Sequence, residues 1–226
     1  MTTERVHPVS KRERSSRGER VIRLSGAGCC VTDLLYDLPA GQDRLTPWLS
    51  RAAADGGVVR GGAVLKSALE RCTGMSVDAW LSVIVGDVQP RRSLGGVSVV
   101  TLIGAAQLLP EDAQVEFYAC LSEDDTGDWL LGQIARTSLG RAKLRRRRGR
   151  QPTTVILNEC HADRAPDRSF VAEPCMPGSL ALELDDLDQD FFESDVVAFS
   201  FMPWEPKLFA DLTSVVSRCK RAGALT

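Results

Sequence analysis

The chain has 226 residues, of which 43% are hydrophobic and 26% are charged, and its formal net charge is −2. These values are ordinary for a soluble globular protein with one sizeable α/β domain, and they exclude a strongly basic nucleic-acid binder or a protein drawn to acidic membranes. Seven cysteines that form no C-x-x-C pair and only two histidines fit neither a zinc site nor a disulfide framework. We therefore expect a cytoplasmic protein without a metal site, a nucleic-acid partner or a membrane contact.

The N-terminal part of the chain divides at about residue 20. Residues 1–20 are polar and basic and lack the apolar core of a signal peptide, so we expect a disordered tail there and an α/β domain over 21–226. The segment Val21–Cys30 is typical of a strand, because it is short, apolar and rich in small residues. It leads into an apolar stretch that contains Asp33. Since ligands of open parallel sheets bind beyond the carboxyl ends of strands, Asp33 is a candidate binding residue, with a solvent-facing turn residue as the alternative.

Residues 41–93 are less regular and are interpreted as an insertion or a lid-related region. Within them, Ala63–Cys72 has helical spacing, and Gly74 is placed to end that helix. The glycine pairs at 56–57 and 61–62 are not followed by a phosphate-loop pattern, so they indicate flexible connections.

The glycine pair Gly95-Gly96 precedes a long uncharged run that Pro110 ends. The run is too short to cross a bilayer and too apolar to face water, which predicts a buried core helix from Gly95 to Leu109. Glycines just ahead of such a helix would let a polar ligand approach the free N–H groups of its first turn. Gly95 and Gly96 are therefore candidate binding residues.

Strands and helices alternate over the rest of the chain. We expect strands at Val115–Leu121, Thr153–Glu159, Arg168–Val171 and Asp195–Phe201. We expect one helix after the acidic turn Ser122–Gly127, to about Ser138. Another helix is expected to start with Leu187–Phe192, and a third to span Lys207–Arg221 before Gly223. The acidic side chains Asp124 and Asp125 would cap the first of these helices. The basic run Arg145–Arg150 is interpreted as a solvated loop. The alternation predicts a parallel sheet, and a further strand is expected to begin at Ala224-Leu225-Thr226.

The order of these segments resembles the ribokinase-like, or PfkB, carbohydrate kinase family. The matching pieces are the opening strand with Asp33, the pair Gly95-Gly96 before a buried helix, the turn Ser122–Gly127, the strand piece Gln151-Pro152-Thr153-Thr154-Val155 with Asp167-Arg168-Ser169-Phe170, and the helix and strand from Asp185-Asp186-Leu187 to Asp195-Val196-Val197. The resemblance covers roughly residues 20 to 226, the N-terminal two-thirds of a typical member.

The resemblance implies a ribokinase-like parallel sheet flanked by helices, with a small lid or insertion and without the C-terminal part. In the full-length family it implies phosphoryl transfer from ATP to a sugar hydroxyl, with ATP and Mg²⁺ as cofactors and a sugar or nucleoside as substrate. The substrate-binding residues that it implies here are Asp33, Gly95 and Gly96, with Arg168 and Ser200 as second-line candidates at strand ends.

Several positions depart from the family pattern. Val100 stands where an asparagine is usual, Ser122 replaces a glycine, and Pro174-Cys175-Met176 replaces a glycine-alanine pair. The family's G-A-G-D motif, which carries the catalytic base and the anion hole, is absent. Gly26-Ala27-Gly28 matches three of its letters, but Cys29 follows and the segment lies on the first strand. We therefore expect no catalytic residue in this chain, and neither ATP nor Mg²⁺ to bind it well.

Two main hypotheses follow from the sequence. The chain is either the sugar-binding portion of an ATP-dependent carbohydrate kinase or a non-enzymatic, degenerate kinase-like binding or regulatory module. A dinucleotide-dependent oxidoreductase fits less well, because Val31 stands at the third glycine position of that fingerprint and Asp33 is too close to it. A parallel sheet that stops after Gly223 would expose a strand edge and an apolar helix face, which predicts self-association or a homodimer.

Overall fold

The computed structural model describes residues 21–39, 43–140, 143–161, 165, 167–173, 180–200 and 205–226. The predicted tail at 1–20 and the departure at Pro174-Cys175-Met176 lie outside the described residues.

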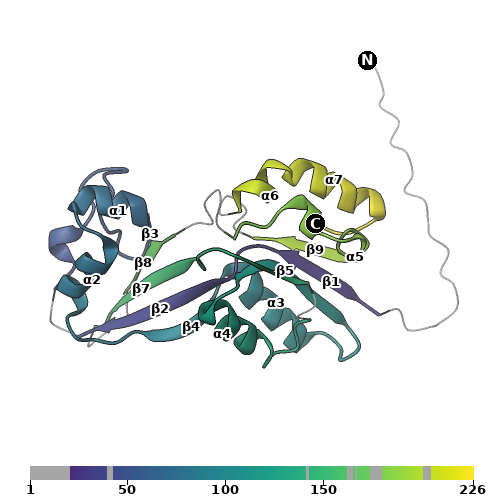
Figure 1. Ribbon diagram of the computed structural model, residues 1–226, viewed down its shortest axis with the longest axis horizontal. Helices are drawn as coiled ribbons and strands as arrows, with labels where there is room; N and C mark the ends of the chain where they lie inside the picture. Colours follow the sequence, from purple (N-terminus) through teal and green to yellow (C-terminus); the bar gives the residue numbers. More distant parts are fainter. Residues whose placement is uncertain are drawn as a thin grey trace, which may run out of the picture.

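A four-stranded parallel sheet forms the first part of the molecule, in the order β6-β5-β1-β9. Its strands are β1 (Arg23–Ala27), β5 (Gln114–Ser122), β6 (Leu144–Arg147) and β9 (Val196–Phe199). Figure 1 shows α3 (Val97–Leu108) and α4 (Asp125–Ile134) on one face, and α5 (Gln189–Phe192), α6 (Pro206–Ala210) and α7 (Leu212–Ala222) on the other. The predicted parallel sheet with helices on both faces is confirmed.

The central strand β5 is buried on both sides, as is usual where helices cover both faces of a sheet. Phe117, Ala119 and Leu121 join the core under α3 and α4, whereas the alternate residues Tyr118 and Cys120 join the core under α5 and α7. This explains why the sequence of β5 is apolar almost throughout.

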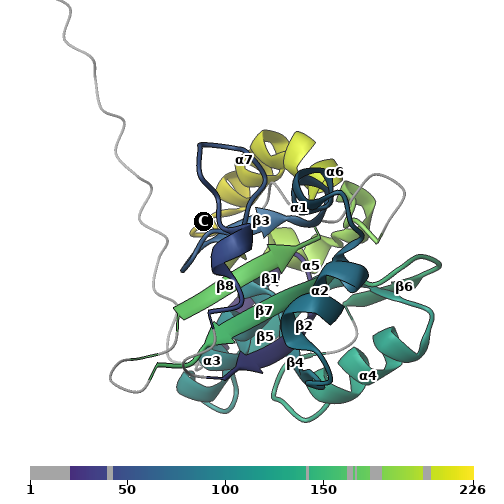
Figure 2. The ribbon, with the colours of Figure 1, turned by 90° about the vertical axis from the view of Figure 1, so that its left-hand side faces the viewer.

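A second sheet of five strands has the order β3-β8-β7-β2-β4. Its strands are β2 (Val31–Leu38), β3 (Ala63–Leu65), β4 (Arg91–Gly95), β7 (Thr153–Glu159) and β8 (Asp167–Ala172). The pairs β2–β7 and β3–β8 are parallel, and the pairs β2–β4 and β7–β8 are antiparallel. Figure 2 shows α1 (Lys66–Thr73) and α2 (Val77–Val85) beside this sheet. The described part of the predicted insertion, residues 43–93, thus adds two helices and two edge strands to the sheet.

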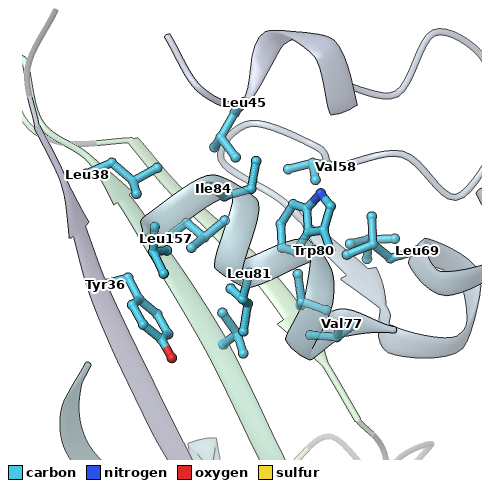
Figure 3. Close-up of a cluster of buried hydrophobic side chains, with 14 residues drawn as sticks. Tyr36, Leu38, Leu45, Val58, Leu69, Val77, Trp80, Leu81, Ile84 and Leu157 are labelled. Carbon is cyan, nitrogen blue, oxygen red and sulfur yellow. The ribbon is translucent and has the colours of Figure 1, made fainter. Parts of the chain in front are cut away.

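A separate hydrophobic core joins the second sheet to α1 and α2 (Figure 3). Leu38 and Leu157 point from the sheet toward Ile84 and the fully buried Trp80 of α2. The 3-10 helix η1 (Thr46–Trp48) adds Trp48, whose ring meets that of Trp80 edge to face at 6.5 Å between centroids. One face of the second sheet is therefore closed by its own helices.

Several predicted boundaries are close to those observed. The strand β7 has the predicted bounds, α1 ends at Gly74 in the left-handed region with φ of 68°, and Asp124 accepts hydrogen bonds from two backbone N–H groups at the start of α4. Gly223 closes α7 as expected, although the predicted single helix is divided at Asp211 into α6 and α7.

The prediction of a solvated loop over Arg145–Arg150 is wrong for its first part. Leu144–Arg147 is an edge strand paired with β5, and carboxylates hold its arginines: Arg146 bonds Asp128 at 2.7 Å, and Arg147 bonds Asp186 of the 3-10 helix η2 (Leu184–Asp186) at 2.8 Å. Charged side chains on an edge strand also discourage pairing with other chains.

The predicted core helix after Gly96 is buried on one side only. Val99 and Leu102 are buried against the first sheet, but the side chains of Val100 and Leu108 are 55% and 88% exposed. At the other end of the sheet, Leu225 forms a parallel bridge with Val196, where a further strand was expected to begin. None of the helices within the described ranges has the length and apolar character of a membrane span.

Candidate ligand-binding site

Asp33 lies inside a strand of the second sheet, as the third residue of β2, and not after the end of the opening strand. The first strand is shorter than predicted and ends at Ala27, so only Gly28-Cys29-Cys30 separate it from β2. This short connection places Asp33 where the two sheets meet.

The two glycines ahead of α3 lie against this same connection. The carboxyl group of Asp33 occupies the space that a Cβ at Gly95 would need, and the carbonyl of Cys29 occupies that space at Gly96. Gly96 also has φ of 110°, a conformation that other residues rarely adopt. At Gly95, therefore, the close approach is made by the chain's own carboxylate and not by the ligand that the sequence predicts.

A cavity of about 420 Å³ opens beside Asp33, on the face of the second sheet that α1 and α2 do not cover. Asp33 and Thr154 are the lining residues with an acidic or hydroxyl side chain. The described residues that line it are Cys29, Val31, Asp33, Gly61, Gly62, Ala63, Gly96, Val97, Thr154, Ile156, Phe170 and Ala172. The cavity thus has a polar part at Asp33 and an otherwise apolar wall, the usual composition of a small-molecule site.

The carboxylate of Asp33 has no hydrogen-bond or ion-pair partner within the described residues, although the side chain is half-buried. Desolvation raises the pKa of Asp33 to about 6. A half-buried carboxylate without a partner is unfavourable in the free protein, and such groups are frequent at functional sites. Asp37 lies four residues further along the same strand and has such partners. Hydrogen bonds from Asn158 and Arg91 hold the pKa of Asp37 below its usual value.

The two second-line candidates lie apart from this cavity. Arg168 is exposed on β8, and its partner in the sheet register is Asn158 of β7. The register partner of Asp33 is Thr154, which lies four residues before Asn158 on β7. Ser200 follows the last residue of β9, and its carbonyl lies next to Gly28. The structure therefore brings Asp33 and Gly96 to one cavity, with Gly95 behind the carboxylate, but it does not bring Arg168 or Ser200 to the cavity wall.

Several lining residues were not identified from the sequence, among them Thr154, Ile156 and Phe170. They belong to predicted strands, but alternation alone does not tell which face of a strand borders a cavity. Cys29 also lines the cavity, and burial raises the pKa of its thiol to about 12, so it does not supply a nucleophilic thiolate at neutral pH.

The residues of this cavity do not fit ATP. Among the described residues no lysine or arginine lines it, and the carboxylate of Asp33 would repel a polyphosphate. Within the described ranges, no group of three or more histidine, cysteine, aspartate or glutamate residues is arranged to hold a metal ion. We therefore derive no chemical step that involves a nucleotide or a metal at this site.

The chain thus combines a four-stranded parallel sheet with helices on both faces, a second sheet of five strands attached through a short connection, and a cavity beside Asp33, in a ribokinase-like architecture. No model of a known protein family matches the sequence, and no curated protein resembles it closely enough to count as a match.

Solved structures do match the chain. An adenosine kinase from Sinorhizobium meliloti is 14% identical with a TM-score of 0.64, over 91% of this chain and 55% of that one. A fructokinase with bound ATP from Xylella fastidiosa is 15% identical with a TM-score of 0.57, over 91% of this chain and 50% of that one. A PfkB protein from Polaromonas sp. JS666 is 13% identical with a TM-score of 0.57, over 90% and 54%. The chain therefore has the fold of these kinases and spans about half of their length.

Proposed function

We propose that this chain binds a small polyhydroxylated molecule, a sugar or a nucleoside, in the cavity beside Asp33, as the substrate-binding portion of a carbohydrate kinase. The observation that carries the proposal is the half-buried carboxylate of Asp33, which faces a cavity and has no partner in the described part of the chain. The fold likeness to sugar and adenosine kinases supports the choice of ligand class.

Asp33 would accept hydrogen bonds from ligand hydroxyls. A carboxylate is an acceptor only, and a hydroxyl is the neutral donor that suits it without bringing a second charge into the cavity. A hydrogen bond to a charged group stabilises a complex by about 1.5–3 kcal/mol, so this contact alone corresponds to a roughly ten- to hundredfold effect on affinity. Gly96 would let the ligand lie against the backbone at the start of α3.

Phosphoryl transfer needs a base at the reacting hydroxyl and cationic or N–H groups around the phosphoryl group. Among the described residues that line the cavity, Asp33 is assigned here to holding the ligand hydroxyls, and no lysine or arginine is present to stabilise a transferring phosphoryl group. The function proposed for the chain itself is therefore binding. Phosphoryl transfer would depend on residues other than those described as lining the cavity. The alternative is a kinase-like binding or regulatory module without catalysis, which Val100 at the usual asparagine position favours.

Isothermal titration with D-fructose and with adenosine tests the proposal. The wild-type chain should bind at least one of them, and Asp33→Asn should weaken that binding at least tenfold. Asp37→Asn is the matched control, because Asp37 lies on the same strand and the same face but outside the cavity lining. A folded wild-type chain that binds neither compound, or equal binding by Asp33→Asn, would refute the proposal.

Release of ADP from ATP in the presence of the bound compound separates the two alternatives. A chain that binds the compound and releases no ADP is a binding module by itself. ADP release that depends on the compound would show that transfer residues are present outside the described cavity.

A further inference from the structure

We propose that Thr154 is a specificity-determining residue of this cavity, whose hydroxyl recognises a second hydroxyl group of the ligand next to the one that Asp33 binds. The inference rests on the proposed function, since it names a further contact to the same ligand.

Thr154 and Asp33 are neighbours across the sheet. Thr154 lies on β7 and is the Cα partner of Asp33 on β2 and of Ala172 on β8. Paired residues of adjacent strands point to the same face, and adjacent strands lie about 4.8 Å apart. Both side chains line the cavity. The carboxylate and the hydroxyl are therefore placed to contact neighbouring groups of one ligand.

The hydroxyl of Thr154 is not used by the protein itself. Its side chain is only 8% exposed, yet within the described residues it makes no hydrogen bond. Oγ1 of Thr32 is buried without a hydrogen-bond partner and is also shielded from solvent. Oγ1 of Thr154 is not among the atoms shielded in this way. Oγ1 of Thr154 therefore reaches the cavity, and a ligand hydroxyl would satisfy it.

The chemistry of the two groups is complementary. A carboxylate only accepts hydrogen bonds, whereas a threonine hydroxyl both donates and accepts. One ligand hydroxyl can donate to Asp33, and the next can accept from or donate to Thr154. Beyond them the wall is apolar, with Ile156 and Phe170, so that few other groups compete for the orientation of the ligand.

The adjacent threonine provides a matched control. Thr153 lies on the same strand, but its side chain points to the opposite face, where it lines a different small cavity. Its Oγ1 donates a hydrogen bond to the carbonyl of Gln151 at 3.5 Å. Valine has nearly the shape of threonine and a similar preference for strands, so Thr154→Val and Thr153→Val each replace only the hydroxyl by a methyl group.

The test is isothermal titration of wild type, Thr154→Val, Thr154→Ser and Thr153→Val with adenosine and its 2′-deoxy and 3′-deoxy analogues, and with D-fructose. We expect Thr154→Val to lower affinity about three- to tenfold for the hydroxylated ligand, as for the loss of one neutral hydrogen bond. The loss should disappear for the deoxy analogue that lacks the recognised hydroxyl. Thr154→Ser should retain the wild-type selectivity, and Thr153→Val should bind like wild type.

The outcomes that overturn the inference are distinct from those that overturn the proposed function. If Asp33→Asn abolishes binding and Thr154→Val binds like wild type, the assignment of Thr154 is wrong and the proposed function stands. An equal loss for every analogue would mean that Thr154 acts through packing, which also overturns the assignment. If wild type binds neither adenosine nor D-fructose, both proposals are refuted.

Discussion

The carboxyl group of Asp33 lies in the space that a side chain at Gly95 would need. The two residues belong to the paired strands β2 and β4, where Asp33 is the partner of Ser93 and Gly95 is the partner of Val31. The absence of a side chain at Gly95 is therefore what allows Asp33 to take its place beside the cavity.

Gly95→Ala should displace that carboxylate. We expect the change to weaken ligand binding at least tenfold and to lower the free energy of unfolding by about 1–3 kcal/mol, as for overpacking at a tight contact. Titration and urea unfolding measure the two effects. Gly104→Ala is the control: no atom lies near its Cβ position in α3, so it should stabilise the chain by about 0.5–1 kcal/mol and leave binding intact. Unchanged affinity in Gly95→Ala would contradict the role of this contact.

The raised pKa of Asp33 predicts a pH dependence of stability. Because the pKa in the folded chain, about 6, lies above the usual 3.8, the contribution of Asp33 to stability is fully present below about pH 4 and is lost as the pH rises through about 6. Asp33→Asn should therefore match wild type near pH 4 and exceed it by about 1–2 kcal/mol above pH 7, after allowance for partial solvent screening. Denaturant unfolding across this range measures the difference.

Asp37→Asn should show the opposite trend. Hydrogen bonding by Asn158 is the largest cause of the lowered pKa of Asp37, followed by the desolvation that opposes it and by Arg91. The stability that this carboxylate contributes is present above its ordinary pKa and is lost as the pH falls through the lowered value. Parallel pH profiles for the two variants would refute the assignment of their environments.

Arg147 should be important for stability, whereas the adjacent Arg148 should not. Arg147 donates to the buried Asp186 at 2.8 Å and to the carbonyl of Ala181 at 2.9 Å, but the side chain of Arg148 is 97% exposed. We expect Arg147→Met to lower the free energy of unfolding by about 2 kcal/mol, because it leaves a buried carboxylate without its main cation. Arg148→Met should change it by less than about 0.5 kcal/mol. Equal urea midpoints for the two variants would contradict this difference.

The cysteines should differ in reactivity. Cys72 is exposed, whereas Cys29 and Cys30 are buried, and desolvation raises the pKa of both buried thiols. Since the thiolate is the reactive form, iodoacetamide at neutral pH should modify Cys72 in the native chain and should reach Cys29 and Cys30 only after unfolding. Peptide mass spectrometry identifies the modified sites. Modification of Cys29 as fast as Cys72 would show that the cavity is open and wet at that residue.

Local patterns in the sequence were enough to predict most strands and helices of the parallel sheet, although the segment of β6 was expected to be a loop. Apolar runs such as Val115–Leu121 and the spacing of the helix that Gly74 ends depend on local chemistry, so their type and approximate bounds could be predicted from the residues. The order of these elements also sufficed for the resemblance to the ribokinase-like kinases, whose fold the chain has.

Which strands form the second sheet, and which residues surround Asp33, depends on tertiary contacts. The strands at Arg91–Gly95 and Leu144–Arg147 are rich in charge, so their strand conformation depends on pairing with β2 and β5 and not on local preference. Thr153 and Thr154 look alike in the sequence, and only the register of β7 with β2 places one of them beside Asp33. Contacts between segments far apart in the chain create the cavity, and no local pattern encodes them.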